Sequence, residues 1–480
     1  MDKCKIIINR ALQVVSIEAK ITMRSLNFLL ASCLAAALTV AAQDRIVCYF
    51  GSWANWRPGN GKFVTADIDA SLCTHFIWTF VTLQGNQVVS SNGDGVNGLR
   101  EFTQLRDKNP KAKLLIAIGG AVDSHGPKYS NMVSSAESRR QFIDSTVALL
   151  KQYKFDGFDV DWEYPTRNGG VPADRNNFVL LLKELKERFT KEGGLILTAA
   201  VAAGTWTASQ AYDIPAISQH LDFINVMTYD FHGSWEPRTG HHAGLRGDLS
   251  VESCVKYWLA QGCPKEKLVV GVPTYGKTWT LADPNNNAPG APAPSAGQPG
   301  PYVREPGSFG YNELCEQIRQ GQWTVRFDER ARAPYAFKGN QWVSYDNVKS
   351  VTEKANYIKE LKLGGAMIWS LETDDKNGAC GEKFPILKAL NAVLRGGHAV
   401  KEETPAPTTM TSATPTSIPA SGTKANTSSG QCTREGNIAD PSSCGYITCV
   451  NNGAGGFTRY ERQCAPGLCY KAATDNCDRP

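Results

Sequence analysis

The sequence predicts a (β/α)8 TIM barrel followed by a small disulfide-rich β module. Eight short runs of β-branched and aromatic residues occur between residues 46 and 371, and amphipathic segments with helical periodicity separate many of them. This alternation is typical of a parallel sheet with crossover helices, and eight strands favour a closed barrel over a doubly wound sheet. After residue 397 the composition changes to a Thr-, Pro- and Ser-rich stretch and then to a cysteine-dense segment, which predicts a separate small module.

Residues 1–42 are predicted to be an N-terminal extension and a signal peptide. Arg24 precedes an apolar run over 26–42 that ends in small residues, and this is the pattern of a secretory signal cleaved before Gln43. At 17 residues the run is short for a membrane-spanning helix, so we expect a secreted, extracellular protein rather than one with a membrane anchor. We expect translation to start at Met23.

The barrel zone is predicted to span residues 43–397. A long segment, 277–348, interrupts the alternation and is Pro- and Gly-rich at its start, which predicts a small α+β insertion between strands seven and eight. Amphipathic stripes predict helices over 138–150 and 177–189. The eight predicted strands are 46–50, 75–81, 113–118, 157–164, 195–202, 223–229, 268–275 and 365–371.

Residues 398–430 are predicted to be an extended, O-glycosylated linker, and residues 431–480 a disulfide-stapled module. The linker contains almost no large apolar residue, and Asn426 begins an N-glycosylation sequon. Two of the 14 cysteines precede the cleavage site, and the remaining twelve form an even number in a secreted chain, so we expect disulfides. No His or Cys pair has zinc-binding spacing, so neither a metal nor a cofactor is expected.

The charge pattern argues against a nucleic-acid partner. A net charge of +5 is small for 480 residues, and the Lys and Arg residues are scattered rather than gathered in a tract. The 11 Trp residues suit a globular protein with aromatic-lined surfaces. We expect a monomer.

The most informative stretch lies within the fourth predicted strand. Asp159, Asp161 and Glu163 occupy alternate positions of an apolar and aromatic run, so a strand would point all three to one face. Like charges this close cannot all ionise cheaply, and at least one pKa should rise, as general acid catalysis requires. Asp156 is out of phase and is expected to hold backbone. The alternatives are a solvated acidic strand end and a metal loop.

Polar and aromatic residues fall near the carboxyl ends of several predicted strands, where barrels carry their chemistry. A single Tyr or Trp at such a position would be interpreted as a packed core residue, but many residues that converge on one rim predict a cleft. The residues at the predicted rim are Trp53, Gly119, Gly120, Glu163, Tyr229, Asp230, Tyr275 and Trp369.

The acidic row also limits the reaction that the cleft could catalyse. Carboxylates on one strand approach a substrate from one side, so they cannot flank a glycosidic bond as an acid and an opposed nucleophile would. If the protein is a glycosidase, Glu163 can be the acid and the nucleophile must come from elsewhere. The 2-acetamido group of the substrate can be that nucleophile, with Asp161 orienting it and Tyr229 within hydrogen-bonding reach.

These motifs together resemble glycoside hydrolase family 18 chitinases, animal and arthropod-type endochitinases in particular. The run Asp156-Gly-Phe-Asp-Val-Asp-Trp-Glu matches the family signature D-G-x-D-x-D-x-E in full. The stretches Cys48-Tyr-Phe-Gly-Ser-Trp, Met227-Thr-Tyr-Asp-Phe-His-Gly-Ser-Trp, Gly271-Val-Pro-Thr-Tyr-Gly and Gly365-Ala-Met-Ile-Trp-Ser also agree, so the resemblance covers the barrel zone.

The resemblance implies a substrate-assisted, retaining mechanism on chitin. Glu163 would protonate the glycosidic oxygen, Asp161 would position the N-acetyl group that attacks C1, Asp159 would share charge or a proton with Asp161, and Tyr229 would assist. The resemblance also implies substrate contacts from Tyr49, Trp53, Trp56, Phe80, Gly119, Gly120, Tyr164, Met227, Asp230, Trp235, Tyr275 and Trp369, with Trp369 as the floor of the −1 sugar.

Three positions depart from the family pattern. The motif S-x-G-G-W reads Ala117-Ile-Gly-Gly-Ala121, so a small polar contact and a stacking platform are missing. Lys277 stands where Arg is common, which replaces a forked donor with a point charge. These changes bear on subsite affinity and pH optimum.

The C-terminal module resembles peritrophin-A type chitin-binding domains through Cys444-Gly-Tyr-Ile-Thr-Cys, Cys464-Ala-Pro-Gly-Leu and Asn476-Cys-Asp, although the usual last Cys is absent and Cys469 appears instead. Its aromatic residues Tyr446, Phe457, Tyr460 and Tyr470 would bind chitin; the alternative is a Cys-rich stalk whose aromatics only pack. Spacing alone leaves the tail connectivity open. The pairs we expect are Cys432–Cys449, Cys464–Cys477 and Cys444–Cys469, with Cys48–Cys73, Cys254–Cys263 and Cys315–Cys380 in the barrel zone.

The favoured function is therefore a secreted endochitinase tethered to chitin by its module. A chitinase-like lectin on the same fold is the alternative, but Asp161, Glu163 and Tyr229 are all retained. A third possibility is a related substrate such as an N-glycan core or peptidoglycan.

Overall fold

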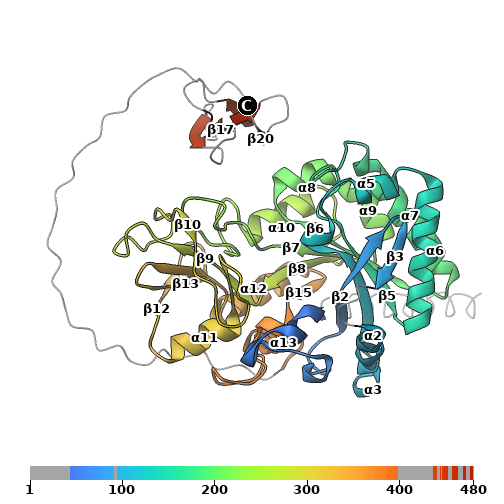
Figure 1. Ribbon diagram of the computed structural model, residues 1–480, viewed down its shortest axis with the longest axis horizontal. Helices are drawn as coiled ribbons and strands as arrows, with labels where there is room; N and C mark the ends of the chain where they lie inside the picture. Colours follow the sequence, from blue (N-terminus) through green and yellow to red (C-terminus); the bar gives the residue numbers. More distant parts are fainter. Residues whose placement is uncertain are drawn as a thin grey trace, which may run out of the picture. The chain divides into compact units, whose positions relative to one another are not determined.

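The computed structural model describes residues 44–90 and 95–397, and in the C-terminal segment residues 436–439, 444, 446–451, 457–462, 469–471 and 476–478. The chain forms two compact units, residues 1–408 and 409–480 (Figure 1). The predicted signal peptide, the linker and Asn426 lie outside the described residues.

Eight parallel strands close into a barrel in the first unit, so the predicted fold class is confirmed. Each strand pairs in parallel with the next one in the ring, and β15 closes the ring by pairing with β1. The strands are β1 (Arg45–Gly51), β2 (His75–Gln84), β4 (Lys113–Gly119), β5 (Gly157–Asp161), β6 (Ile196–Ala202), β7 (Phe223–Met227), β8 (Leu268–Pro273) and β15 (Gly365–Trp369).

Helices surround the barrel (Figure 1). The two long helices predicted from their apolar stripes are present, and the second buries Phe178, Leu181, Leu182 and Leu185. The α-helices of the barrel are α2 (Gly95–Thr103), α3 (Leu105–Lys108), α4 (Gly120–Asp123), α5 (Lys128–Val133), α6 (Ala136–Tyr153), α7 (Asp174–Lys191), α8 (Thr205–Ala211), α9 (Ile214–His220), α10 (Val251–Ala260), α12 (Val348–Leu361) and α13 (Pro385–Leu394). Short 3-10 helices span Ser52–Trp56, Gly59–Gly61, Thr65–Asp67 and Leu371–Thr373.

The barrel strands separate two apolar cores, because successive side chains of a strand point to opposite faces. On β1, Ile46 and Cys48 pack in the outer core beneath the helices, whereas Val47 and Tyr49 pack inside the barrel. Residues on the inner face near the carboxyl ends of the strands are therefore directed toward the mouth of the barrel.

A small antiparallel sheet with one helix lies between β8 and β15, which matches the predicted α+β insertion. Its strand order is β10-β9-β14-β13-β12, with β11 paired to β9. The edge-to-face pair Trp279 and Trp342, both fully buried, forms the centre of its own apolar cluster. The elements are β9 (Tyr275–Thr280), β10 (Ser295–Ala296), β11 (Ser308–Gly310), α11 (Tyr311–Arg319), β12 (Thr324–Asp328), β13 (Ala333–Lys338) and β14 (Gln341–Ser344). A short strand that was not predicted, β3 (Gln87–Ser90), forms a hairpin with β2.

Two of the three disulfides predicted for the barrel are present and one prediction is wrong. The bonds Cys48–Cys73 and Cys315–Cys380 form as expected. Cys254 and Cys263 are both free and buried. Cys254 lies six residues before the end of α10, which puts it about 9 Å from that end along the axis. Cys263 lies three residues past that end, where its backbone N–H donates to the carbonyl of Trp258 at 3.1 Å.

The C-terminal unit contains two small antiparallel sheets, one of β16 (Gly436–Ala439), β17 (Tyr446–Asn451) and β18 (Phe457–Arg462), the other of β19 (Cys469–Lys471) and β20 (Asn476–Asp478). The predicted bond Cys444–Cys469 is present, and Cys449 is also disulfide-bonded. Cys432 and Cys464, the partners predicted for Cys449 and Cys477, lie outside the described residues. Within the part of the chain that the structure describes, no helix is long and apolar enough to cross a membrane.

Candidate active site

The fourth barrel strand places its acids at different depths. Asp159 and Asp161 lie on β5, and both side chains are buried within the barrel mouth. Glu163 lies two residues beyond the end of β5 and is only partly buried. Its position is fixed through its backbone, because its N–H donates to Ser124 Oγ at 2.9 Å and its carbonyl accepts from Asn168 Nδ2 at 3.0 Å.

Asp159 is enclosed by hydrogen-bond donors from three other strands. Tyr49 Oη donates to its carboxylate at 2.8 Å, Thr198 Oγ1 at 2.5 Å and Asn225 Nδ2 at 3.4 Å. Asn225 Nδ2 also donates to Tyr49 Oη at 2.9 Å. Burial raises the pKa of Asp159 to about 6, and the three donors keep it from rising further because they stabilise the charged form.

Asp161 and Glu163 also hold their protons more tightly than ordinary carboxyls. Burial raises the pKa of Asp161 well above its usual range, and the charges of Glu163 and Asp159 raise it further. Burial raises the pKa of Glu163 to about 7; Tyr164 opposes this by hydrogen bonding, and the charge of Asp230 adds to it. Near neutral pH the pair Asp161 and Glu163 can therefore hold a proton, as a general acid must.

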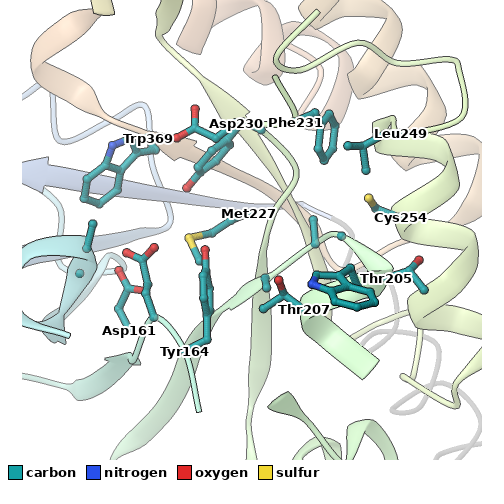
Figure 2. A pocket seen from close by; sticks show the side chains of 18 of the residues that line it. Asp161, Tyr164, Thr205, Thr207, Met227, Asp230, Phe231, Leu249, Cys254 and Trp369 are labelled. Atoms are coloured by element: carbon teal, nitrogen blue, oxygen red, sulfur yellow. The ribbon is translucent and has the colours of Figure 1, made fainter. Parts of the chain in front are cut away.

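These acids open into a cavity of about 730 Å³ at the mouth of the barrel (Figure 2). Most of the side chains predicted from the sequence meet there: Phe80, Gly120, Asp161, Glu163, Tyr164, Met227, Tyr229, Asp230, Trp235, Tyr275 and Trp369. They come from loops and strand ends around the barrel, as the predicted cleft requires.

Four other predicted site residues lie outside this wall. Tyr49, predicted to touch substrate, is buried on the inner face of β1 and donates a hydrogen bond to Asp159. Gly119 allows the backbone of β5 to approach closely, since a Cβ there would lie 2.0 Å from the carbonyl oxygen of Asp161. Trp53 and Trp56 are exposed, and Trp53 stacks on Phe80 with ring centroids 6.1 Å apart.

Asp230 is held by a group of polar side chains from the small sheet and its neighbouring loop. Tyr275 Oη donates to Asp230 at 2.5 Å, Lys277 Nζ lies 3.2 Å from its other oxygen, and His242 Nδ1 lies 3.5 Å away. Burial alone would raise the pKa of Asp230, but His242 and Lys277 outweigh it and hold the pKa at about 2. Asp230 therefore stays charged, and Lys277 pairs with it as a single point charge.

Two polar groups at the cavity wall have no strong partner. Asp161 Oδ1 is buried and has no hydrogen-bond partner among the described residues. Among the residues that the structure describes, the hydroxyl of Tyr229 donates only to the sulfur of Met367, at 3.8 Å. Since buried polar atoms are normally satisfied, both are poised to bind polar groups of a ligand.

Asp156 has the backbone role that its phase predicts. Its carboxylate accepts from the backbone N–H of Leu114 on β4 at 2.8 Å and lies 3.5 Å from Arg106. At the positions that depart from the family pattern, Ala117 is buried inside the barrel and Ala121 lines the cavity.

Sequence reasoning missed four residues of the site. Thr198 and Asn225 hydrogen-bond Asp159, and Asn225 could have been found because it alternates with Met227 on β7. Ser124 binds the backbone of Glu163, and Trp206 lines the cavity. Neither of these two belongs to a periodic pattern, so no local signal marks it.

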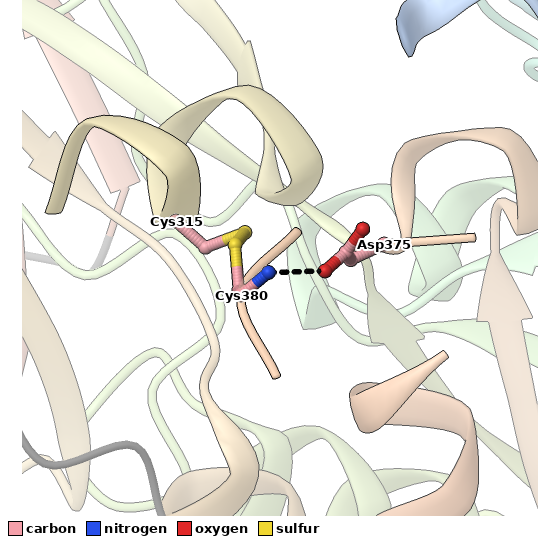
Figure 3. Close-up of side chains that lie close together, drawn as sticks. All are labelled: Cys315, Asp375 and Cys380. Carbon is pink, nitrogen blue, oxygen red and sulfur yellow. Dashed lines mark hydrogen bonds between the residues drawn. A yellow bond between two sulfur atoms is a disulfide. The ribbon is translucent and has the colours of Figure 1, made fainter. Parts of the chain in front are cut away.

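A cluster of one aspartate and two cysteines resembles a metal site, but its geometry has another explanation. Cys315, Asp375 and Cys380 bring potential ligand atoms within 4.8 Å of one another. Figure 3 shows that the two sulfurs are bonded to each other, while Asp375 accepts from the backbone N–H of Cys380 at 2.8 Å. Sulfurs joined in this way are not thiolate ligands, so this group braces a loop.

Comparisons with known proteins agree on one family. The model of Glycosyl hydrolases family 18 matches residues 45–374. Probable chitinase 10 of Drosophila melanogaster is 41% identical over 369 residues, which cover 73% of this chain but only 16% of that protein. The solved Group IV chitinase of Ostrinia furnacalis in complex with allosamidin is 44% identical with a TM-score of 0.72, covering 74% of this chain and 99% of that one. Human YKL-39, described as a pseudo-chitinase with retained chitooligosaccharide binding, is 37% identical with a TM-score of 0.69, covering 73% of this chain and 99% of that one.

Proposed function

The chain belongs to family 18 of the glycosyl hydrolases, and on that basis we propose that it is a secreted, retaining endochitinase. Its substrate would be the β-1,4-linked N-acetylglucosamine chain of chitin. The observation that carries this proposal is a pair of acids in the cavity: a buried Asp161 oxygen that has no hydrogen-bond partner within the described part of the chain, and a Glu163 whose pKa is raised. The open cavity with exposed Trp53 and Trp235 near it suits cleavage within a polymer.

In the first step Glu163 gives its proton to the glycosidic oxygen as the bond from that oxygen to C1 breaks. The acetamido oxygen of the same sugar attacks C1 and forms an oxazolinium ion, while Asp161 accepts the acetamido N–H and Tyr229 donates to the acetamido group. Asp159, buried below Asp161, shares charge or a proton with it.

In the second step water attacks C1 from the side that the leaving group vacated. Glu163, now a carboxylate, takes a proton from that water, and the C1–oxygen bond of the oxazolinium ion breaks. Two inversions give net retention. Asp230, a further acid of the cavity wall, is engaged by Tyr275 and Lys277, which favours the substrate's own acetamido group as nucleophile.

Glu163→Gln tests this proposal on a defined chitin hexamer. We expect hydrolysis to fall by about 10³-fold or more, because the general acid is lost, while calorimetry should still detect binding. The native enzyme should release product first as the β-anomer, which NMR can follow. Unchanged turnover in the variant would refute Glu163 as the general acid, and release of the α-anomer would contradict retention.

A chitin-oligosaccharide-binding lectin is the second candidate, since YKL-39 is described as a pseudo-chitinase that retains such binding. Turnover of the hexamer by the native protein separates the two, because a lectin would bind without product.

The C-terminal unit is proposed to anchor the enzyme on solid chitin. Deleting residues 431–480 should then lower activity on insoluble chitin far more than on soluble oligomers, because tethering raises only the local concentration of polymer. Equal losses on both would point to a structural role.

A further inference from the structure

One exposed tryptophan in the cavity wall belongs to none of the motifs. Trp206 is the second residue of α8, lines the cavity and is 51% exposed. A large ring left half in solvent within a concave wall is a surface available to a ligand. Sugar rings carry an apolar face that packs on such a ring.

The residues around Trp206 form one end of the cavity, here called the α8 arm: Thr205, Trp206, Thr207, Leu249 and Cys254. In Figure 2, the labelled members of this arm lie at one side of the cavity, whereas Asp161 and Trp369 lie at the other. Burial raises the pKa of the Cys254 thiol to about 12, so this thiol stays uncharged.

A different set of aromatic rings lies on the Trp369 side. Phe80 and Trp53 pack near Trp369, with ring centroids 5.7 and 6.2 Å from it. A chain whose reacting sugar rests on Trp369 can therefore extend one way along Trp53 and the other way into the α8 arm, past Glu163.

The ring of Trp206 is also tied to the loop that carries the acid. The guanidinium of Arg167 lies 5.3 Å from the Trp206 ring centroid, which fixes one face of the indole by a cation–π contact. Arg167 N donates to the Tyr164 carbonyl at 3.0 Å, and Asn168 Nδ2 donates to the Glu163 carbonyl at 3.0 Å. The platform and the acid are thus connected through residues 163–168.

We propose that Trp206 is the stacking platform for the leaving-group side of the bound sugar chain, and that it thereby helps to decide which bond of an oligosaccharide is cut. This inference rests on the proposed function, with the reacting sugar resting on Trp369 as the family resemblance implies.

The test compares Trp206→Ala with Trp206→Phe on a chitin hexamer labelled with ¹⁸O at its reducing end. Mass spectrometry of the products then reports how many sugars left with each cut. In Trp206→Ala, kcat/KM should fall about tenfold, the size of one lost stacking contact, and cuts that release long leaving groups should decline most. Trp206→Phe, which keeps an aromatic face, should restore most of both.

A short substrate provides the control. A 4-nitrophenyl glycoside of N,N′-diacetylchitobiose fills only the position next to Glu163 on the leaving side, so its turnover should stay within about twofold. Equal losses on the two substrates, no rescue by Phe, or a decline of long retained products instead of long leaving groups would each overturn the assignment.

Binding measurements separate this inference from the proposed function. In a Glu163→Gln background, adding Trp206→Ala should weaken hexamer binding about tenfold. That result together with no hydrolysis by the native protein would refute the proposed function but leave Trp206 as a sugar platform. Unchanged affinity would refute the platform.

Discussion

Tyr49→Phe removes one hydroxyl and tests the charge state of the buried acid row. Tyr49 Oη donates to Asp159 at 2.8 Å and accepts from Asn225 at 2.9 Å, and all three side chains are buried. The variant keeps the ring and its packing. It leaves Asp159 with fewer donors, so the pKa of Asp159 should rise above its present value of about 6.

The size of the loss depends on pH. A hydrogen bond to a charged group is worth about 2 kcal/mol and one to a neutral group about 1 kcal/mol. Tyr49→Phe should therefore lower the free energy of unfolding by about 2 kcal/mol at pH 8, where Asp159 is charged, and by about 1 kcal/mol at pH 4.5, where it is protonated. The difference corresponds to a rise in the pKa of Asp159 of about 0.7.

The sign follows from linkage. Because the folded-state pKa of Asp159 lies above its ordinary value, this group makes the free energy of unfolding fall as pH rises from about 4 toward about 6. Without Tyr49 Oη, the free energy of unfolding should fall by more as pH rises, and the fall should continue to higher pH.

Urea unfolding of the full chain at both pH values, followed by tryptophan fluorescence, measures the effect. Tyr357→Phe is the matched control, because the Tyr357 hydroxyl is buried and has no hydrogen-bond partner among the described residues; it should change the free energy of unfolding by less than about 0.5 kcal/mol at either pH. An equal loss at both pH values for Tyr49→Phe, or a larger one at pH 4.5, would refute a charged Asp159 at neutral pH.

Two further predictions concern the acid and the free cysteines. Asp230→Asn should move the alkaline limb of kcat/KM to lower pH, because the charge of Asp230 helps to raise the pKa of Glu163; a shift to higher pH would contradict this. Alkylation of the denatured, unreduced protein should label Cys254 and Cys263 but not Cys48, Cys73, Cys315 or Cys380, and a Cys254–Cys263 linked peptide in the mass spectrum would contradict it.

The barrel could be predicted because its signal is repeated along the chain. Each strand is a short apolar run whose inner and outer positions are both buried, as Val47 and Cys48 illustrate. The hairpin strand β3 has only four residues, one of them exposed, and such a segment carries too little pattern to be recognised. That Cys254 and Cys263 are free could not be predicted, because their spacing in the sequence does not tell where the helix that carries Cys254 ends.

The site could be predicted where its residues sit on motifs and not where they depend on packing. Asn225 shares the period of β7 with Met227, so its inward position is implicit in the sequence. Trp206 follows Gly204 and Thr205 at the start of a short helix, and only the folded chain places it in the wall of the same cavity as Asp161. Tyr49 was predicted near the site, but the depth that makes it a partner of Asp159 is a property of the closed barrel.

The acid row works because its three members differ in depth, and the end of β5 creates that difference. An unbroken strand would give Asp159, Asp161 and Glu163 similar surroundings and set them in competition for one proton. Instead the strand ends at Asp161, and Glu163 is held beyond it by Ser124 and Asn168. Asp159 is surrounded by donors that favour its charge, whereas Glu163 lies in the cavity wall near the charge of Asp230, which favours its proton. In the proposed mechanism, a substrate that brings its own nucleophile would meet a protonated acid, Glu163, at the outer end of the row and an acceptor, Asp161, below it.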